Sequence, residues 1–214
     1  SVVVVIRDIT ARHAAEETLR RDRRIFHDLA QSFIQIKDIN ELTTNVLTKL
    51  ATNYGFDFGL FTQFIPSTNK LHRTASVGEF RSPIPPYIDL TDDNAESFLV
   101  THIFKTKTAV FISDIEQEID ELPYLRSIQK YGAKSVMAAP IVDDVENVQA
   151  VVSFATTTAR IFTESDVELF STITRMLGSL LERRNAELQK QTAQEALERE
   201  RRAFQSIANA VVNT

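Results

Sequence analysis

Residues 135–156 read SVMAAPIVDDVENVQAVVSFAT, which is two apolar runs on either side of an acidic turn. Their Val-rich composition predicts strands over 135–142 and 148–156, joined at Asp143-Asp144. Upstream, residues 56–65 and 70–77 flank a Pro-Ser-Thr-Asn turn and predict a second hairpin. Two hairpins with helical segments kept apart from them indicate an α+β fold. We expect a central antiparallel sheet of five or six strands with helices on its faces.

Helices are predicted before and after the hairpins. Asp38-Ile-Asn-Glu41 has the form of a capping box at the start of one helix, and Gly55 suits its left-handed C-terminal cap. Thr163-Glu-Ser-Asp166 begins a long helix that continues to the end of the chain. Between the hairpins, residues 78–90 hold three Pro and are predicted to form a surface loop.

The end of the chain repeats its beginning. Residues 17–30 read ETLRRDRRIFHDLA and residues 195–208 read EALERERRAFQSIA, with 7 of 14 positions identical. The offset of 178 residues (195 − 17) is the length of a domain, which indicates that one module ends and another begins. We therefore expect a helix, a globular domain and a helix that leads into a further domain.

Composition limits the function. The chain has 214 residues and a formal net charge of −5, so it has no basic field for nucleic acid and nucleic-acid binding is not expected. It has no Cys, which excludes disulfides, iron–sulfur clusters and a Cys-linked bilin in this segment. No apolar run is long enough for a transmembrane helix. We expect a cytoplasmic segment, whose parent protein could be associated with a membrane.

Three segments resemble the GAF domain, a fold for small-molecule sensing and dimerisation. Residues 132–141 (GAKSVMAAPI) resemble the family's fourth-strand segment, in which a strand of small residues ends in Pro-Ile or Pro-Leu. Residues 160–170 (RIFTESDVELF) resemble its entry into the last helix, and residues 104–114 (FKTKTAVFISD) its helix-to-strand segment. The resemblance covers about 38–183 and implies a GAF-like sheet flanked by long N- and C-terminal signalling helices.

The start of the chain resembles the end of a PAS domain. Residues 5–17 (VIRDITARHAAEE) are similar to the last PAS strand, which runs through Asp-Ile-Thr into a linker helix. This resemblance implies that Asp8 and Thr10 couple the preceding domain to its output helix. The expected order is the end of a PAS domain at 1–10, a linker or coiled-coil helix at 11–37, a GAF domain at 38–183, and a linker helix to a GAF-like module at 184–214. Arrays of this kind are typical of bacterial and archaeal sensor proteins, such as the sensor histidine kinases of two-component systems.

The GAF resemblance implies a pocket between the sheet and the helices that follow the first hairpin, with residues 80–132 as its lid. Six polar residues are candidates for binding a ligand there: Tyr87, His102, Asp114, Tyr124, Arg126 and Ser135. The alternative is that Phe side chains fill the pocket and that the domain only transmits a signal.

The sequence gives little support for the cofactors of known GAF domains. Those that bind cyclic nucleotides carry an Asn-Lys pair, a Phe and then Asp-Glu. Phe162 and Asp166 fit this spacing, but Val167 replaces the Glu and no Asn-Lys pair lies shortly upstream. A haem ligand would have to be His72 or His102, and a lone His is more often structural. Neither cyclic nucleotide, haem nor a metal site is therefore expected.

Heptad spacing predicts that the flanking helices pair with a second copy of the chain. Residues seven apart form this pattern: Leu19, Phe26 and Phe33, then Leu181 and Leu188, then Leu197 and Phe204. The step of nine between Leu188 and Leu197 breaks the register, and such a break locally rewinds a coiled coil. We expect a parallel homodimer in which two helix registers of similar energy carry the signal.

The leading hypothesis is a non-catalytic sensory module that binds a small molecule and transmits the signal through dimeric helices. Its expected partners are a second copy and the neighbouring PAS and GAF-like domains. Two alternatives stay open: a ligand-free dimerisation spacer, and a fragment of an enzyme whose catalytic domain lies outside this segment.

Overall fold

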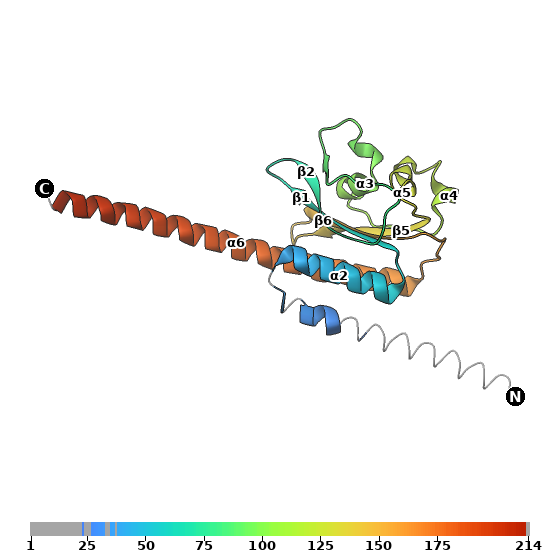
Figure 1. Ribbon diagram of the computed structural model, residues 1–214, viewed down its shortest axis with the longest axis horizontal. Helices are drawn as coiled ribbons and strands as arrows, with labels where there is room; N and C mark the ends of the chain where they lie inside the picture. The colour runs from blue at the N-terminus through green and yellow to red at the C-terminus, as the bar shows by residue number, and fades with distance from the viewer. Residues whose placement is uncertain (1–22, 24–26, 33–34, 37, 213–214) are drawn as a thin grey trace, which may run out of the picture.

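The computed structural model describes residues 23, 27–32, 35–36 and 38–212 (Figure 1). At its centre is a six-stranded sheet of order β3-β2-β1-β6-β5-β4, in which neighbouring strands run antiparallel. The strands are β1 (Phe58–Ile65), β2 (Lys70–Val77), β3 (Tyr87–Asp89), β4 (Val110–Ile112), β5 (Ser135–Val142) and β6 (Val148–Thr156). The predicted α+β fold and the strand count are confirmed.

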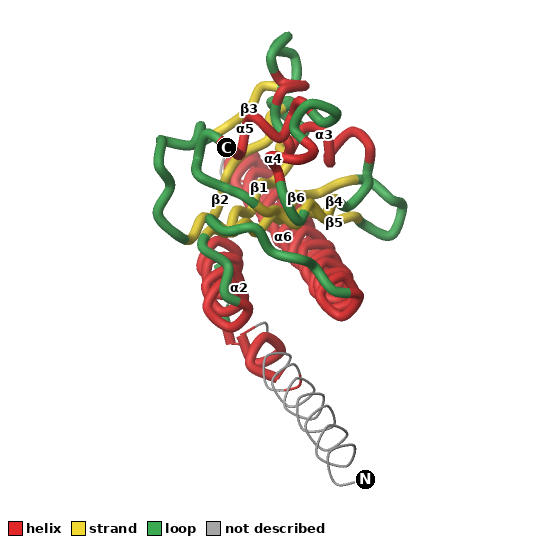
Figure 2. Tube along the Cα trace, turned by 90° about the vertical axis from the view of Figure 1, so that its right-hand side faces the viewer, coloured by secondary structure: helices red, strands yellow, loops and turns green. Residues whose placement is uncertain are grey.

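Helices cover both faces of the sheet. Figure 1 shows α2 and α6 on one face and α3, α4 and α5 on the other, and Figure 2 shows the same layers after a quarter turn. The helices are α2 (Ile39–Tyr54), α3 (Leu99–Thr106), α4 (Ile115–Glu118), α5 (Arg126–Gln129) and α6 (Glu164–Val212), with short 3₁₀ turns η1 (Ala95–Ser97) and η2 (Pro123–Leu125).

The predicted loop at 78–90 is wrong at its end, because this segment contains strand β3. Tyr87–Asp89 pairs with residues 70–72 on the outer edge of β2. A strand of three residues next to two Pro carries no periodic pattern, so its pairing depends on tertiary contacts that the local sequence does not show.

The predicted caps of α2 form, and α6 has a cap of its own. The Asp38 carboxylate accepts hydrogen bonds from the N–H groups of Asn40 and Glu41, both at 2.9 Å. Gly55 closes α2 with φ 67°, in the left-handed region that a Gly adopts without steric cost. At the start of α6, the Thr163 N–H donates to the Asp166 carboxylate (2.8 Å), and the Asp166 N–H donates to the Thr163 hydroxyl (3.2 Å). This reciprocal pair is a capping box with Asp in place of Glu.

Alternate side chains of the central strands pack on opposite faces of the sheet. Val152 and Phe154 belong to the core that α2 and α6 cover, together with Phe61 and Phe170. Val151, which precedes Val152 on β6, faces the core of α3, α4 and α5. The central strands β1, β5 and β6 therefore contact both helical layers.

Helix α6 packs on the sheet first and then leaves the domain. Leu177 and Leu181 are buried in the core, whereas Leu197 is 66% exposed. Figure 1 shows the C-terminal part of α6 running well beyond the sheet. Within the described residues, no helix combines the length and the apolar character that crossing a membrane requires.

At Gly178, α6 approaches the sheet closely. A Cβ atom added there would lie 2.7 Å from the Val142 carbonyl oxygen, which is backbone and cannot turn away. Replacing Gly by Ala in an exposed helix usually stabilises it by about 1 kcal/mol. Here we expect the opposite sign: Gly178→Ala lowers the free energy of unfolding by about 1–3 kcal/mol, because α6 must move off β5.

Chemical denaturation at fixed protein concentration measures this effect. The control is Ser179→Ala, an exposed neighbour on the same helix, which should change the free energy of unfolding by less than about 0.5 kcal/mol. A Gly178→Ala variant as stable as the parent chain would contradict the close packing of α6 on β5.

Candidate functional site

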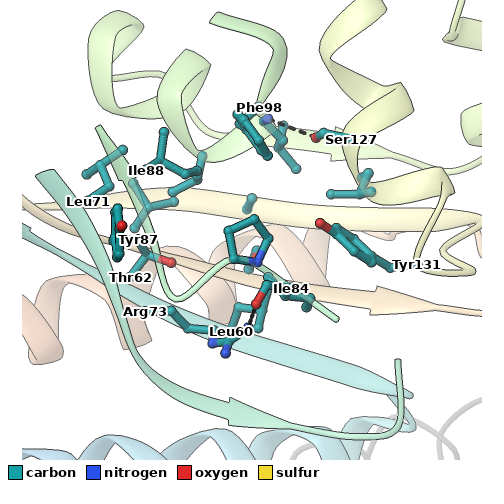
Figure 3. Close-up of a pocket in the computed structure, with 17 residues that line it drawn as sticks. Leu60, Thr62, Leu71, Arg73, Ile84, Tyr87, Ile88, Phe98, Ser127 and Tyr131 are labelled. Atoms are coloured by element: carbon teal, nitrogen blue, oxygen red, sulfur yellow. Dashed lines mark hydrogen bonds between the residues drawn. The ribbon is translucent and has the colours of Figure 1, made fainter. Parts of the chain in front are cut away.

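A cavity lies between the sheet and the helices α3 and α5, where the sequence predicts a pocket (Figure 3). Its enclosed volume is about 60 Å³. Sheet residues form the floor, including Leu60, Ala138 and Val151. The segment 84–88 and the residues Phe98 and Ile128 form the walls. A cavity of this size admits a molecule of only a few heavy atoms.

Most of the lining is apolar. Among the described residues that line the cavity, Arg73 is the one with a charged side chain. The neutral polar side chains in the lining are Thr62, Tyr87, Ser127, Tyr131 and Ser153. The Ser127 hydroxyl is already used, since it donates to the Tyr124 carbonyl (2.7 Å) and accepts from the Leu99 N–H (3.2 Å).

A β-bulge turns Arg73 toward the cavity. Phe61 on β1 pairs with Ala75 on β2, but the next residue, Thr62, pairs with Arg73, so that Thr74 is the extra residue. Simple alternation would place Arg73 on the face of Ala75, which packs against the helices α2 and α6. The bulge reverses the phase and brings Arg73 beside Thr62 on the cavity face.

Two hydrogen bonds hold Arg73 in the wall. Its guanidinium Nη1 donates to the Ile84 carbonyl (2.7 Å), and its backbone N–H donates to the Pro86 carbonyl (2.8 Å). Arg73 is not among the six residues predicted from the sequence, because nothing in the sequence of β2 marks the bulge.

The structure places one of the six predicted ligand residues in this cavity. Tyr87 lines it from β3, with its side chain 53% exposed and the Lys70 Nζ 4.6 Å from its ring centroid. His102 and Tyr124 lie together outside it, with stacked rings whose centroids are 4.0 Å apart. Burial, and secondarily the charge of Glu118, raises the pKa of Tyr124, which keeps that phenol neutral.

The other three predicted residues also lie outside the cavity lining, each with a different contact. Asp114 caps α4 by accepting from the Glu116 N–H (3.0 Å). Arg126 is largely exposed and pairs with Asp120 at 3.7 Å. Ser135 is fully buried, and its hydroxyl donates to the Ser113 carbonyl (2.8 Å) and accepts from the Arg160 N–H (2.6 Å). That these residues bind a ligand stays a prediction.

The GAF domain model matches residues 36–182 of the chain. The chain belongs to the GAF domain family. The comparison with curated proteins returns no match.

Several solved structures share the fold of this GAF domain. The GAF domain of an Acinetobacter phosphoenolpyruvate-protein phosphotransferase is 13% identical, with a TM-score of 0.62 over 79% of this chain and 95% of that one. Free methionine-R-sulfoxide reductase from Neisseria meningitidis, in complex with its substrate, is 13% identical, with a TM-score of 0.63 over 78% and 91% of the two chains. The phycoerythrobilin-bound GAF domain of a cyanobacterial phytochrome is 16% identical, with a TM-score of 0.58 over 78% and 96%. At these identities the likeness shows the fold alone.

The segment before α2 packs onto the GAF domain. Residues 27–32 are helical, and Leu29 is fully buried in the core of α2 and α6. The Lys49 ammonium of α2 donates to the Ser32 hydroxyl (2.7 Å) and to the Asp28 carbonyl (3.0 Å). These contacts fix the end of the incoming helix to α2.

The residues predicted for signal coupling and dimerisation fall in different places. Asp8, Thr10, Leu19, Phe26 and Phe33 lie outside the described residues, as do the side chains of Leu188 and Phe204. Leu181 is 2% exposed and packs in the core of its own GAF domain, whereas Leu197 is exposed on the projecting part of α6.

Proposed function

We propose that this GAF domain is a non-catalytic sensory module that binds a small molecule in the sheet–helix cavity and transmits its presence through α2 and α6. The observation that carries the proposal is the double role of the central strands. Ala138, Val151 and Ser153 line the cavity, while their neighbours Val152 and Phe154 pack on the helix side. A ligand that shifts these strands therefore changes the surface on which the helices rest.

Contacts at both ends of the helical layer support transmission. On the input side, Leu29 and Lys49 join the incoming helix to α2. On the output side, the Glu182 carboxylate of α6 accepts from the Asp144 N–H in the β5–β6 turn. The turn and the helix are thus linked by a charge-assisted hydrogen bond close to the point where α6 leaves the sheet.

The partner that we propose for the projecting helix is a second copy of the chain. The heptad spacing of Leu197 and Phe204 and the exposure of Leu197 support this pairing, because an exposed Leu on a long helix gains from burial against a second helix. We also propose that the module belongs to an array with a PAS domain before it and a GAF-like module after it. The sequence repeat and the PAS-like segment at 5–17 support that order.

A native mass spectrum of the purified chain tests the function, recorded gently and again after denaturation. We expect a dimer that carries a small extra mass, which denaturation removes. A dimer without extra mass that also binds none of a broad set of small molecules would favour a ligand-free spacer. A monomer at micromolar concentration would contradict the proposed pairing of the helices.

A further inference from the structure

The cavity lining has hydrogen-bond donors that the protein leaves unused. Tyr131 is 6% exposed, and its ring packs edge-on to Phe80 with centroids 6.4 Å apart. Among the described residues, no protein group forms a hydrogen bond with its hydroxyl, which points into the cavity in Figure 3. A buried Tyr hydroxyl usually has a partner. This one is therefore available to a molecule in the cavity.

A second hydroxyl of this kind lies on the sheet. Thr62 is 8% exposed, lines the cavity, and has no hydrogen-bond partner for its side chain within the described part of the chain. It lies directly opposite Arg73 in the β1–β2 ladder. Figure 3 shows Thr62 and Arg73 on one side of the cavity and the Tyr131 hydroxyl on the other.

Arg73 brings a positive charge that the protein does not neutralise. Its guanidinium uses one N–H for the Ile84 carbonyl, and no carboxylate of the described residues lies within ion-pair distance of it. A guanidinium has five N–H donors in a planar fork, so most of them stay free. Such a fork matches the two oxygens of a carboxylate.

The rest of the lining defines the other properties of the ligand. No Asp or Glu is among the described residues that line the cavity, so a cation would meet a like charge and no counterion. Most of the remaining lining consists of Leu, Ile, Val, Phe, Pro and Ala side chains, which favour an apolar body. The narrow interior favours a molecule with few heavy atoms.

We infer that the cavity takes a small organic carboxylate with an apolar body. The carboxylate accepts hydrogen bonds from the Arg73 guanidinium and the Thr62 hydroxyl, and the Tyr131 hydroxyl contacts the opposite end of the molecule. The inference rests on the proposed ligand-binding function, and it adds the charge of the ligand and the residue that recognises that charge. The bulge at Thr74 has a role in this arrangement, since it places Arg73 where the anion is bound.

Calorimetric titration of the 214-residue chain at neutral pH tests the inference with matched probes. The probes are acid and amide pairs of increasing size: isobutyrate and isobutyramide, isovalerate and isovaleramide, phenylacetate and phenylacetamide. Isopentylamine is the cationic probe. We expect at least one acid to bind about tenfold to hundredfold more tightly than its amide, as for a hydrogen bond to a charged group. The amine should not bind.

Two further results would be decisive. Amides or the amine that bind as well as the acids would overturn the inferred anion site and leave the proposed ligand-binding function standing. A chain that binds no acid, amide or amine would count against both.

Variants then assign the recognition to Arg73. Arg73→Gln keeps a donor for the Ile84 carbonyl but removes the charge. It should weaken the binding of the acid roughly tenfold to hundredfold and leave the binding of the amide unchanged. Arg183→Gln, on the exposed face of α6 outside the cavity lining, is the matched control and should change neither. A loss of acid and amide binding in equal measure would show that Arg73 only supports the wall, and would overturn the inference.

Two other variants keep the test valid if Arg73→Gln folds poorly. Arg73→Lys retains the charge without the fork, so it should still prefer the acid over the amide, with reduced affinity. Tyr131→Phe removes one hydroxyl and should weaken the binding of a probe that reaches it by a few-fold, whereas Tyr54→Phe, in the core on the α2 and α6 side of the sheet, should not. An Arg73→Lys variant with no preference between acid and amide would contradict the role of the charge.

Discussion

Phe154→Ala is expected to lower the free energy of unfolding by about 3–5 kcal/mol, the usual cost of removing a large aromatic side chain from a core. Phe154 is 1% exposed on β6, and its ring centroid lies 5.0 Å from that of Phe56 and 6.0 Å from that of Phe170. It therefore joins the sheet to the start of α6. It also covers Gly59 on the neighbouring strand, where an added Cβ would lie 2.9 Å from the Phe154 ring.

Thermal and chemical denaturation measure this loss, with Ile161→Ala as the control. Ile161 is 83% exposed, so its truncation should change the free energy of unfolding by less than about 0.5 kcal/mol. Hydrogen exchange should also rise in the first turns of α6 in the Phe154 variant, because the helix loses the ring on which it rests. An effect of Phe154→Ala below about 1 kcal/mol would show that the sheet and α6 are not joined through this ring.

The long strands could be predicted from the sequence because each is a run of apolar, β-branched residues bounded by turn residues. The ranges 70–77, 135–142 and 148–156 agree with β2, β5 and β6, since long β-rich runs between turn residues have few other ways to bury their apolar side chains. The caps at Asp38 and Gly55 were equally local, because each depends on one side chain or one backbone angle.

The candidate site was harder to predict because it depends on strand pairing and helix packing between segments far apart in the sequence. The bulge at Thr74 moves the side chains of residues 70–73 to the face opposite the one that strict alternation would give them. No residue type in β2 predicts this bulge. The strand therefore gave no reason to select Arg73 or its neighbour Thr62. The short helices α4 and α5 give a second reason. Four residues have no periodicity from which to tell the inner face from the outer one, so the sequence could not show that Arg126 lies on the outer face.

The flanking helices show the limit of heptad spacing. Leu181 and Leu188 are seven apart, a spacing that fits a coiled coil and equally fits a helix that packs on its own sheet. Leu181 is buried in its own domain, so the heptad seam that is free for a second copy starts farther along α6, toward Leu197.

Ser153→Phe is expected to abolish ligand binding, with a loss of affinity of roughly hundredfold or more, while the chain stays folded. Ser153 lies on β6 between its cross-strand partners Leu60 and Ala138, and all three line the cavity. The central strand cannot move aside, so the Phe ring must occupy the space of the ligand. Because the ring enters an existing void, the cost of overpacking should stay at or below about 1–3 kcal/mol.

The matched control is Ser76→Phe, because Ser76 pairs with Leu60 from the other side but is exposed and outside the cavity lining. Both variants add the same ring beside the same residue, and only one of them fills the void. The native mass spectrum should show the small extra mass in the parent chain and in the Ser76 variant, and none in the Ser153 variant. Titration with the tightest-binding acid should agree: the parent chain and the Ser76 variant should bind the acid, and the Ser153 variant should not. If the Ser153 variant kept its ligand, the molecule would have to bind elsewhere, and the double role of the central strands would no longer explain how this domain senses it.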